Sequence, residues 1–346
     1  MDKIEDEHGT WVFIVPVSNL VLTKDIGYEF KVDRITFIDS SKLPRIRKRL
    51  GFPSTLSEFK KRLPEVLDHF FGKSKTFATM RLTGVGCEME ELFLSHVRDE
   101  LSLLTLSQLG YSRRNYQAIP YISEEGKTGS LSLLMLNVGK NSWVHSNQDT
   151  SKLGELRLDK EWINWQGSYF FPLLDIIRGK TKLSNSWRKD IRSAAILAGQ
   201  SQQSTDRTKC FLWNMIALEL LLTKQGDTYT DMLPKRVEAF LGWMTRWDSC
   251  KFEEQIRSIY KKRCAFVHAG DQSSVEISDI LFSDVLILNV LINIAIHPVL
   301  FKSKEDLVNF SEKVEAEKVL GLKSKIRPKT ITAILPIYRD DDYKKI

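Results

Sequence analysis

One stretch decides how the C-terminal part of this chain folds, Phe252-Glu-Glu-Gln-Ile-Arg-Ser-Ile-Tyr-Lys-Lys-Arg-Cys-Ala-Phe-Val-His-Ala-Gly270. Its apolar residues recur at steps of three and four, which predicts an amphipathic helix, and Gly270 is a residue type that commonly ends one. The apolar stripe consists of Phe252, Ile256, Ile259, Tyr260 and Val267. Arg263 falls on this stripe, where a core residue is expected. Because a guanidinium is rarely buried alone, we expect Arg263 to point into an interior or an interface and to have a partner there.

His268 follows Arg263 by five residues, in the last turn of the predicted helix. At ~100° per residue, the two side chains lie ~140° apart around a regular helix, so they do not converge on one phosphate. Either the helix deforms near its end, or two copies of the chain meet about a two-fold axis and share a cleft. Each residue also has a structural interpretation: His268 is favoured by the helix dipole, and Arg263 either snorkels, with its apolar stem buried and its charge in water, or forms an ion pair. The candidate partners for that ion pair are Glu219, Glu253 and Glu254.

The segment Arg263-Cys-Ala-Phe-Val-His268 resembles the R-x4-H signature of HEPN domains. Tyr260 and Gly270 match the Y-x-x-R…V-H-x-G surroundings of the abortive-infection, Apea-like branch of that family. An upstream helix is similar to the ALE-A-L-L helix of the same branch, Trp213-Asn-Met-Ile-Ala-Leu-Glu-Leu-Leu-Leu222. The resemblance covers about residues 184–300, and the N-terminal half carries none.

HEPN domains are helical bundles, often dimeric, and many are metal-independent ribonucleases whose Arg and His line a cleft between protomers. The resemblance therefore implies that Arg263 and His268 are catalytic and that the partner is RNA, with tRNA among the candidates. The supporting residues would be Glu219, Tyr260 and Cys264, and the RNA-binding residues would be Arg257, Lys261 and Lys262. It also implies a toxin-like role in phage defence, with a phage-derived trigger or an antitoxin as a further partner.

Position 264 departs from the family, which commonly has Asn, Ser, Asp or His after the arginine, whereas this chain has Cys264. The second interpretation is therefore a catalytically silent HEPN module that dimerises or binds nucleotides or RNA. The role of Glu219 is also open. It lies in an otherwise apolar helix and is expected to be half-buried, where it orients Arg263 or His268 or is a structural acid.

Composition limits the class of protein. Hydrophobic residues make up 42% and charged residues 27% of 346 residues, which is typical of a globular protein. The net charge of +7 favours polyanions, and we expect nucleic acid as the partner rather than the alternative, an anionic membrane surface. Four cysteines lack C-x-x-C spacing, which fits a reducing, cytoplasmic compartment and predicts neither a zinc site nor disulfides. HExxH and G-x-S-x-G motifs are absent as well, so we expect no cofactor or metal.

The order of patterns predicts an α+β protein with a boundary near residue 180. Residues 1–180 form a β-containing domain that senses a trigger or restrains the nuclease, and residues 181–346 form the helical HEPN-like domain with a tail. Ile280–Ile296, the most apolar stretch, is predicted to be a buried core helix rather than a membrane span. The predicted strands are Thr10–Val17, Tyr28–Ile38, Lys75–Leu82, 129–138 and Thr330–Ile337. The predicted helices are Ser54–Phe71, Glu88–Leu109, Ser184–Gln203, Asp206–Lys224, Thr230–Leu241, Cys250–His268, Val275–Ile296 and Lys304–Leu320. A basic segment, Lys42–Arg49, is either a phosphate-contacting patch or a solvated turn.

Overall fold

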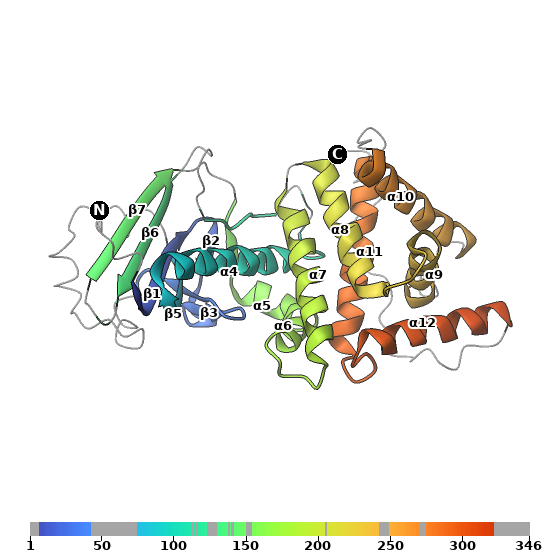
Figure 1. Ribbon diagram of the computed structural model, residues 1–346, viewed down its shortest axis with the longest axis horizontal. Helices are drawn as coiled ribbons and strands as arrows, with labels where there is room; N and C mark the ends of the chain where they lie inside the picture. The colour runs from blue at the N-terminus through green and yellow to red at the C-terminus, as the bar shows by residue number, and fades with distance from the viewer. Residues whose placement is uncertain are drawn as a thin grey trace. The chain divides into compact units, whose positions relative to one another are not determined.

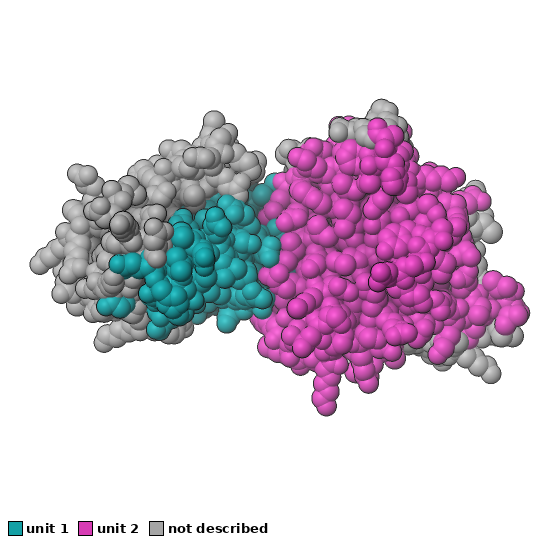
Figure 2. Space-filling model, in the orientation of Figure 1, with its two compact units in different colours: residues 1–104, 116–164 teal, residues 105–115, 165–346 magenta. Residues whose placement is uncertain are grey.

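The computed structural model describes residues 7–42, 75–112, 114, 117–122, 130–137, 139, 142–149, 154–204, 206–241, 249–269 and 275–321. It confirms an α+β protein in which a small antiparallel sheet is followed by a helical region (Figure 1). The chain divides into two compact units, coloured separately in Figure 2: residues 1–104 with 116–164, and residues 105–115 with 165–346. The predicted boundary near residue 180 therefore falls inside the second unit, and the short segment 105–115 belongs to the helical unit rather than to the sheet.

The first unit is built on a six-stranded sheet with the strand order β3-β4-β5-β1-β6-β7, in which all neighbours are antiparallel. The strands are β1 (His8–Val17), β3 (Glu29–Lys31), β4 (Thr36–Asp39), β5 (Thr76–Val85), β6 (Ser130–Asn137) and β7 (Ser142–Asp149). Every residue of β1 from Trp11 to Val17 is buried, because its continuous apolar run is covered on both faces. A separate parallel pair is formed by β2 (Leu20–Leu22) and β8 (Leu156–Leu158).

Helix α4 (Gly86–Leu106) packs on this sheet, with the ring of Phe93 stacked 5.2 Å from that of Phe13 in β1. On the same helix Glu100 is fully buried, and its carboxylate accepts hydrogen bonds from three successive backbone N–H groups, those of residues 33–35. Those three residues form the turn between β3 and β4. The prediction of one strand over Tyr28–Ile38 is therefore wrong, because a carboxylate from a distant helix satisfies the backbone where the strand breaks.

Other parts of the first half were predicted less completely. Strands β2, β7 and β8 were not predicted, and the aromatic region after residue 155 contains two unassigned helices, α5 (Lys160–Gln166) and α6 (Phe170–Ile177). The predicted helix Ser54–Phe71, the basic residues 43–49 and the predicted strand Thr330–Ile337 lie outside the described residues.

The second unit contains the six helices predicted after Ser184, each with ends within two residues of the prediction. They are α7 (Asn185–Gln203), α8 (Arg207–Leu222), α9 (Tyr229–Leu241), α10 (Ser249–Ala269), α11 (Ile277–Ile296) and α12 (Lys304–Val319). The first two helices begin after capping residues. Ser184 and Asp206 each accept a hydrogen bond from the backbone N–H three residues later, which satisfies a donor of the first turn.

Helix α11 is the core of this unit and packs against α6, α7, α8 and α9. Among the described helices it is the one that is long and apolar enough to cross a membrane. However, 94% of its apolar stretch is buried inside the protein, as predicted for a core helix. Its most deeply buried acid, Asp284, is fully enclosed and forms an ion pair with Arg114, 2.7 Å from Nη2 to Oδ1. Side-chain amides of Gln202 and Asn214 donate to the same oxygen, each at 2.7 Å. This cluster attaches the segment 105–115 to α7, α8 and α11.

Candidate functional site

Helix α10 carries both residues of the predicted catalytic pair and is continuous from Ser249 to Ala269. Four members of the predicted stripe, Phe252, Ile256, Ile259 and Tyr260, are buried. The fifth, Val267, was expected in the core but is 48% exposed. Burial falls along the second half of α10: residues 262–266 are half-buried and residues 267–269 are exposed, so Val267 lies beyond the covered part of the helix.

Arg263 has the partner that its position on the stripe predicts. Its Nη2 donates to Oε2 of Glu219 on α8 at 2.8 Å, and the two side chains are 16% and 10% exposed. The guanidinium carbon also lies 5.8 Å from the centroid of the Tyr260 ring, which is the geometry of a cation–π contact. Glu219 is therefore the partner among the three acids considered, and both contacts fix the direction of the guanidinium.

Glu219 is buried, with 8% of the residue exposed. Burial raises the pKa of its carboxyl group, while the charge of Arg263 and hydrogen bonds from Tyr260 and Arg263 lower it, and the net shift is upward. Burial, followed by the negative charge of Glu219, likewise raises the pKa of the Tyr260 phenol. Glu219, Tyr260 and Arg263 therefore form one electrostatically coupled cluster. Within the described residues, the carboxylate orients Arg263 and makes no hydrogen bond with His268.

His268 lies in the last turn of α10, where it is exposed and has no hydrogen bond or ion pair within the described chain. Because α10 stays α-helical through Ala269, His268 and Arg263 diverge by ~140° around the axis. One copy of the chain thus does not bring the two side chains together in the described residues. Gly270, where the helix was considered to deform, lies outside them.

The three cations predicted to contact RNA differ in how far their charges are already compensated. Arg257 donates to Asp231 at 2.8 Å and to Glu253 at 3.2 Å, and these contacts raise its pKa. Lys262 forms an ion pair with Asp279 at 2.8 Å. Lys261 is exposed and has no ion pair in the part of the chain that the structure describes. Of the three, Lys261 is the one whose charge is available to a phosphate without breaking a contact.

Cys264 is a free, half-buried thiol beside Arg263. It lies one turn after Tyr260, and its charge in the thiolate form contributes to the raised pKa of that phenol. The position is therefore adjacent to the cluster, on the half-exposed part of α10.

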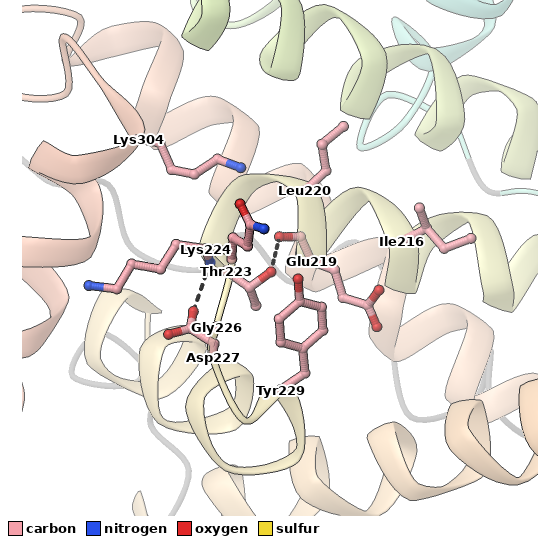
Figure 3. A pocket seen from close by; sticks show the side chains of 10 residues that line it. Ile216, Glu219, Leu220, Thr223, Lys224, Gly226, Asp227, Tyr229 and Lys304 are labelled. Carbon is pink, nitrogen blue, oxygen red and sulfur yellow. Dashed lines mark hydrogen bonds between the residues drawn. The ribbon is translucent and has the colours of Figure 1, made fainter.

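A pocket of about 560 Å³ lies next to the cluster and was not predicted from the sequence (Figure 3). It is formed by the last turns of α8, the connection from α8 to α9, and the start of α12. Its lining residues are Ile216, Glu219, Leu220, Thr223, Lys224, Gln225, Gly226, Asp227, Tyr229 and Lys304. Glu219 belongs both to this pocket and to the ion pair with Arg263. In the sequence, the signal that could have indicated this pocket is the polar run directly after the ALE helix, Lys224-Gln-Gly-Asp-Thr-Tyr229.

Among the described residues, no three His, Cys, Asp or Glu side chains gather closely enough to hold a metal ion. Comparisons of the chain with protein-family models, with curated proteins and with solved structures gave no match. The HEPN resemblance therefore rests on the residues of α8 and α10 quoted above and stays a prediction.

Proposed function

We propose that this protein is a metal-independent endoribonuclease of the HEPN type, acting as a homodimer with one shared cleft. The observation that carries the proposal is the arrangement on α10. Arg263 is held by Glu219 and Tyr260, whereas His268, five residues later, is exposed and uncommitted in the described chain. A fixed cation and a free imidazole are the two groups that cleavage of RNA by its own 2′-OH requires.

The reaction needs one base, one acid and a stabilised phosphorane. One His268 takes the proton of the ribose 2′-OH, whose oxygen attacks the adjacent phosphorus. The bond from phosphorus to the 5′-oxygen then breaks, and a second His268 gives that oxygen a proton. Arg263 donates to the phosphoryl oxygens as charge develops. Since a guanidinium has five N–H donors and Glu219 accepts from Nη2, donors remain for the phosphate.

Two observations support a dimer. Arg263 and His268 diverge on a regular helix, so an isologous pair of α10 helices is the arrangement that lets copies of both residues line one cleft. Val267, between them, exposes 48% of its surface. A mixed dimer of the Arg263→Ala and His268→Ala chains should therefore recover part of the activity that each pure variant lacks. A monomeric mass by light scattering at micromolar concentration, together with full activity, would rule out the shared cleft.

A second function, a catalytically silent dimerisation or RNA-binding module, is favoured by the same ion pair. The charge of Arg263 is already compensated by a buried carboxylate, which is what a purely structural arginine requires. Cys264 beside it departs from the family pattern. This module would bind RNA without cleaving it.

Cleavage of RNA by the purified protein separates the two functions. Arg263→Ala and His268→Ala should each lower the rate by about a hundredfold or more, and the double variant should be no slower than the slower single variant. Exposed residues of the same types supply matched controls, Arg207→Ala and His8→Ala, which should leave the rate unchanged. Binding without cleavage by the unaltered chain would favour the silent module.

The biological part of the proposal follows from the family resemblance. The protein would act in the cytoplasm as a toxin-like effector of phage defence, with tRNA as a candidate substrate. The sheet-containing unit would then sense a trigger or restrain the nuclease.

A further inference from the structure

We infer that the pocket at the end of α8 holds one nucleotide of the RNA, with the base inside and a phosphate at its lysine rim. This inference rests on the proposed function in one respect, namely that the nucleotide belongs to the substrate. The pocket is separate from the Arg263–His268 pair but shares Glu219 with it.

The size and the apolar lining fit a nucleobase. A volume of about 560 Å³ lies within the range of small-molecule sites. Ile216 and Leu220, on successive turns of α8, are half-buried and supply an apolar wall. Tyr229, at the start of α9, is 36% exposed although it is a large aromatic residue. An exposed aromatic ring beside an apolar wall is the usual platform on which single-stranded bases stack.

All four charged residues of the lining are paired, and the two lysines have the more exposed ion pairs. The acid Asp227 is held by Arg236 and the acid Glu219 by Arg263, so neither offers a free negative charge. Lys224 and Lys304 are paired as well, with Glu312 at 3.8 Å and Asp190 at 3.1 Å. These two pairs are partly exposed, and exposed pairs contribute little, so a phosphate can replace the carboxylates at low cost.

The end of α8 sets the orientation of the nucleotide. The C-terminal turn of a helix carries a partial negative charge, which repels a phosphate and attracts N–H donors. The base amino groups should therefore face α8, and the phosphate should face the lysines. In the view of Figure 3, Lys304 lies at one side of the pocket, and Ile216 lies at the other, next to the carboxylate of Glu219.

Two polar groups remain free to recognise the base. The side-chain amide of Gln225 and the hydroxyl of Tyr229 form no hydrogen bond within the described residues, and both line the pocket. Amide and hydroxyl groups can both donate to and accept from the edges of an unstacked base. Because Glu219 connects the pocket with Arg263, a nucleotide bound here determines which neighbouring phosphate approaches the guanidinium.

The test measures binding of a fluorescein-labelled ribohexamer of mixed sequence whose 2′-OH groups are methylated, so that 2′-OH attack is blocked. Fluorescence anisotropy should show that Tyr229→Ala and Lys304→Ala each raise Kd at least fivefold. Tyr229→Phe keeps the stacking ring and loses the hydroxyl, so it should raise Kd less than Tyr229→Ala does. Lys313→Ala, an exposed lysine of the same helix α12 outside the pocket, is the matched control and should stay within twofold.

A third pocket variant and a set of free nucleotides complete the binding test. Gln225→Ala, at an exposed position, leaves the core intact and should weaken binding at least twofold. Unchanged Kd values for all three pocket variants would overturn the inference. Tyr229-dependent binding of free AMP, GMP, CMP or UMP without any effect on the hexamer would also overturn it, since the site would then take a free nucleotide.

Failure of the inference and failure of the proposed function are distinguishable. If the unaltered protein cleaves no RNA but binds the hexamer in a Tyr229-dependent way, the nuclease proposal fails and the pocket assignment stands. If it cleaves RNA and the pocket variants keep the same KM and kcat, the pocket assignment fails and the nuclease proposal stands.

Discussion

Arg263 on α10 and Glu219 on α8 are joined by a 2.8 Å ion pair, and each interrupts an otherwise apolar helix face. The two exceptions to the hydrophobic pattern thus compensate one another. A carboxylate with 10% of its side chain exposed is costly without a partner, and a guanidinium with 16% exposed needs an acceptor. The pair therefore serves the fold and also fixes the cation that we propose for catalysis.

The ion pair predicts a pH-dependent loss of stability in Arg263→Ala. Burial already raises the pKa of Glu219, and removing Arg263 removes the charge that lowers it. An acid with a raised pKa stabilises the fold below its unfolded pKa, and this contribution is lost as the pH rises. At pH 4.5 the urea midpoint of the variant should therefore be near that of the wild type. At pH 8 the free energy of unfolding of the variant should be about 2 kcal/mol lower than that of the wild type. Adding Glu219→Gln should restore much of the loss, and an equal loss at both pH values would contradict this account.

Cys264→Ser tests whether the thiol has a chemical role. Serine is common at this position in the family that the motif resembles, and Cys264 is half-buried rather than enclosed. We expect the cleavage rate to be kept or raised and the melting temperature to change little. A loss of activity in a folded variant would mean that the thiol takes part in the reaction.

The buried ion pair between Arg114 and Asp284 predicts that the helical unit depends on the segment 105–115. Arg114→Met leaves a fully buried carboxylate without its cation and should cost about 3 kcal/mol in urea unfolding. Arg207→Met, at an exposed position, is the matched control and should leave the free energy of unfolding nearly unchanged. A chain of residues 181–346 alone should unfold at a lower urea concentration than the full protein's helical unit, and an unchanged midpoint would show that the segment is dispensable.

Glu100 predicts a second pH dependence, in the sheet-containing unit. Burial raises its pKa from 4.5 to about 7, although three backbone N–H groups favour the charged form. A raised folded pKa means that stability from this group is present below pH 4.5 and is lost as the pH rises toward 7, by about 3 kcal/mol. The stability difference between Glu100→Gln and wild type should therefore shift in favour of the variant from pH 5 to pH 8. A pH-independent difference would show that Glu100 does not titrate in this range.

The sequence predicted features that depend on local chemistry. Helix bounds in the second unit followed from sequence patterns that act within a few residues, and two of the predicted first residues, Ser184 and Asp206, are the capping residues in the structure. The Arg263–Glu219 contact was among the predicted alternatives because both residues break an apolar stripe. In each case the information lies in one helix or in two neighbouring ones.

The features that were missed depend on contacts between distant residues. Glu100 breaks the strand predicted over Tyr28–Ile38 from 65 to 67 residues away, and Arg114 meets Asp284 across 170 residues. Periodicity placed Val267 on the inner face of α10, but it contained no information on how much of the last turn other parts of the chain cover. The pocket likewise needs Lys304, far along the chain from the α8 residues that line it.

The central claim, cleavage of RNA by its own 2′-OH through Arg263 and His268, is tested most directly by the chemistry of the product ends. RNA should be incubated with the purified protein in EDTA and the fragments analysed by mass spectrometry, with DNA of the same sequence in parallel. The account predicts cleavage in EDTA, fragments with 2′,3′-cyclic phosphate and 5′-hydroxyl ends, and intact DNA, because DNA lacks the attacking hydroxyl. Fragments carrying 5′-phosphate, or cleavage that disappears with EDTA, would point to a metal-activated water and contradict the account.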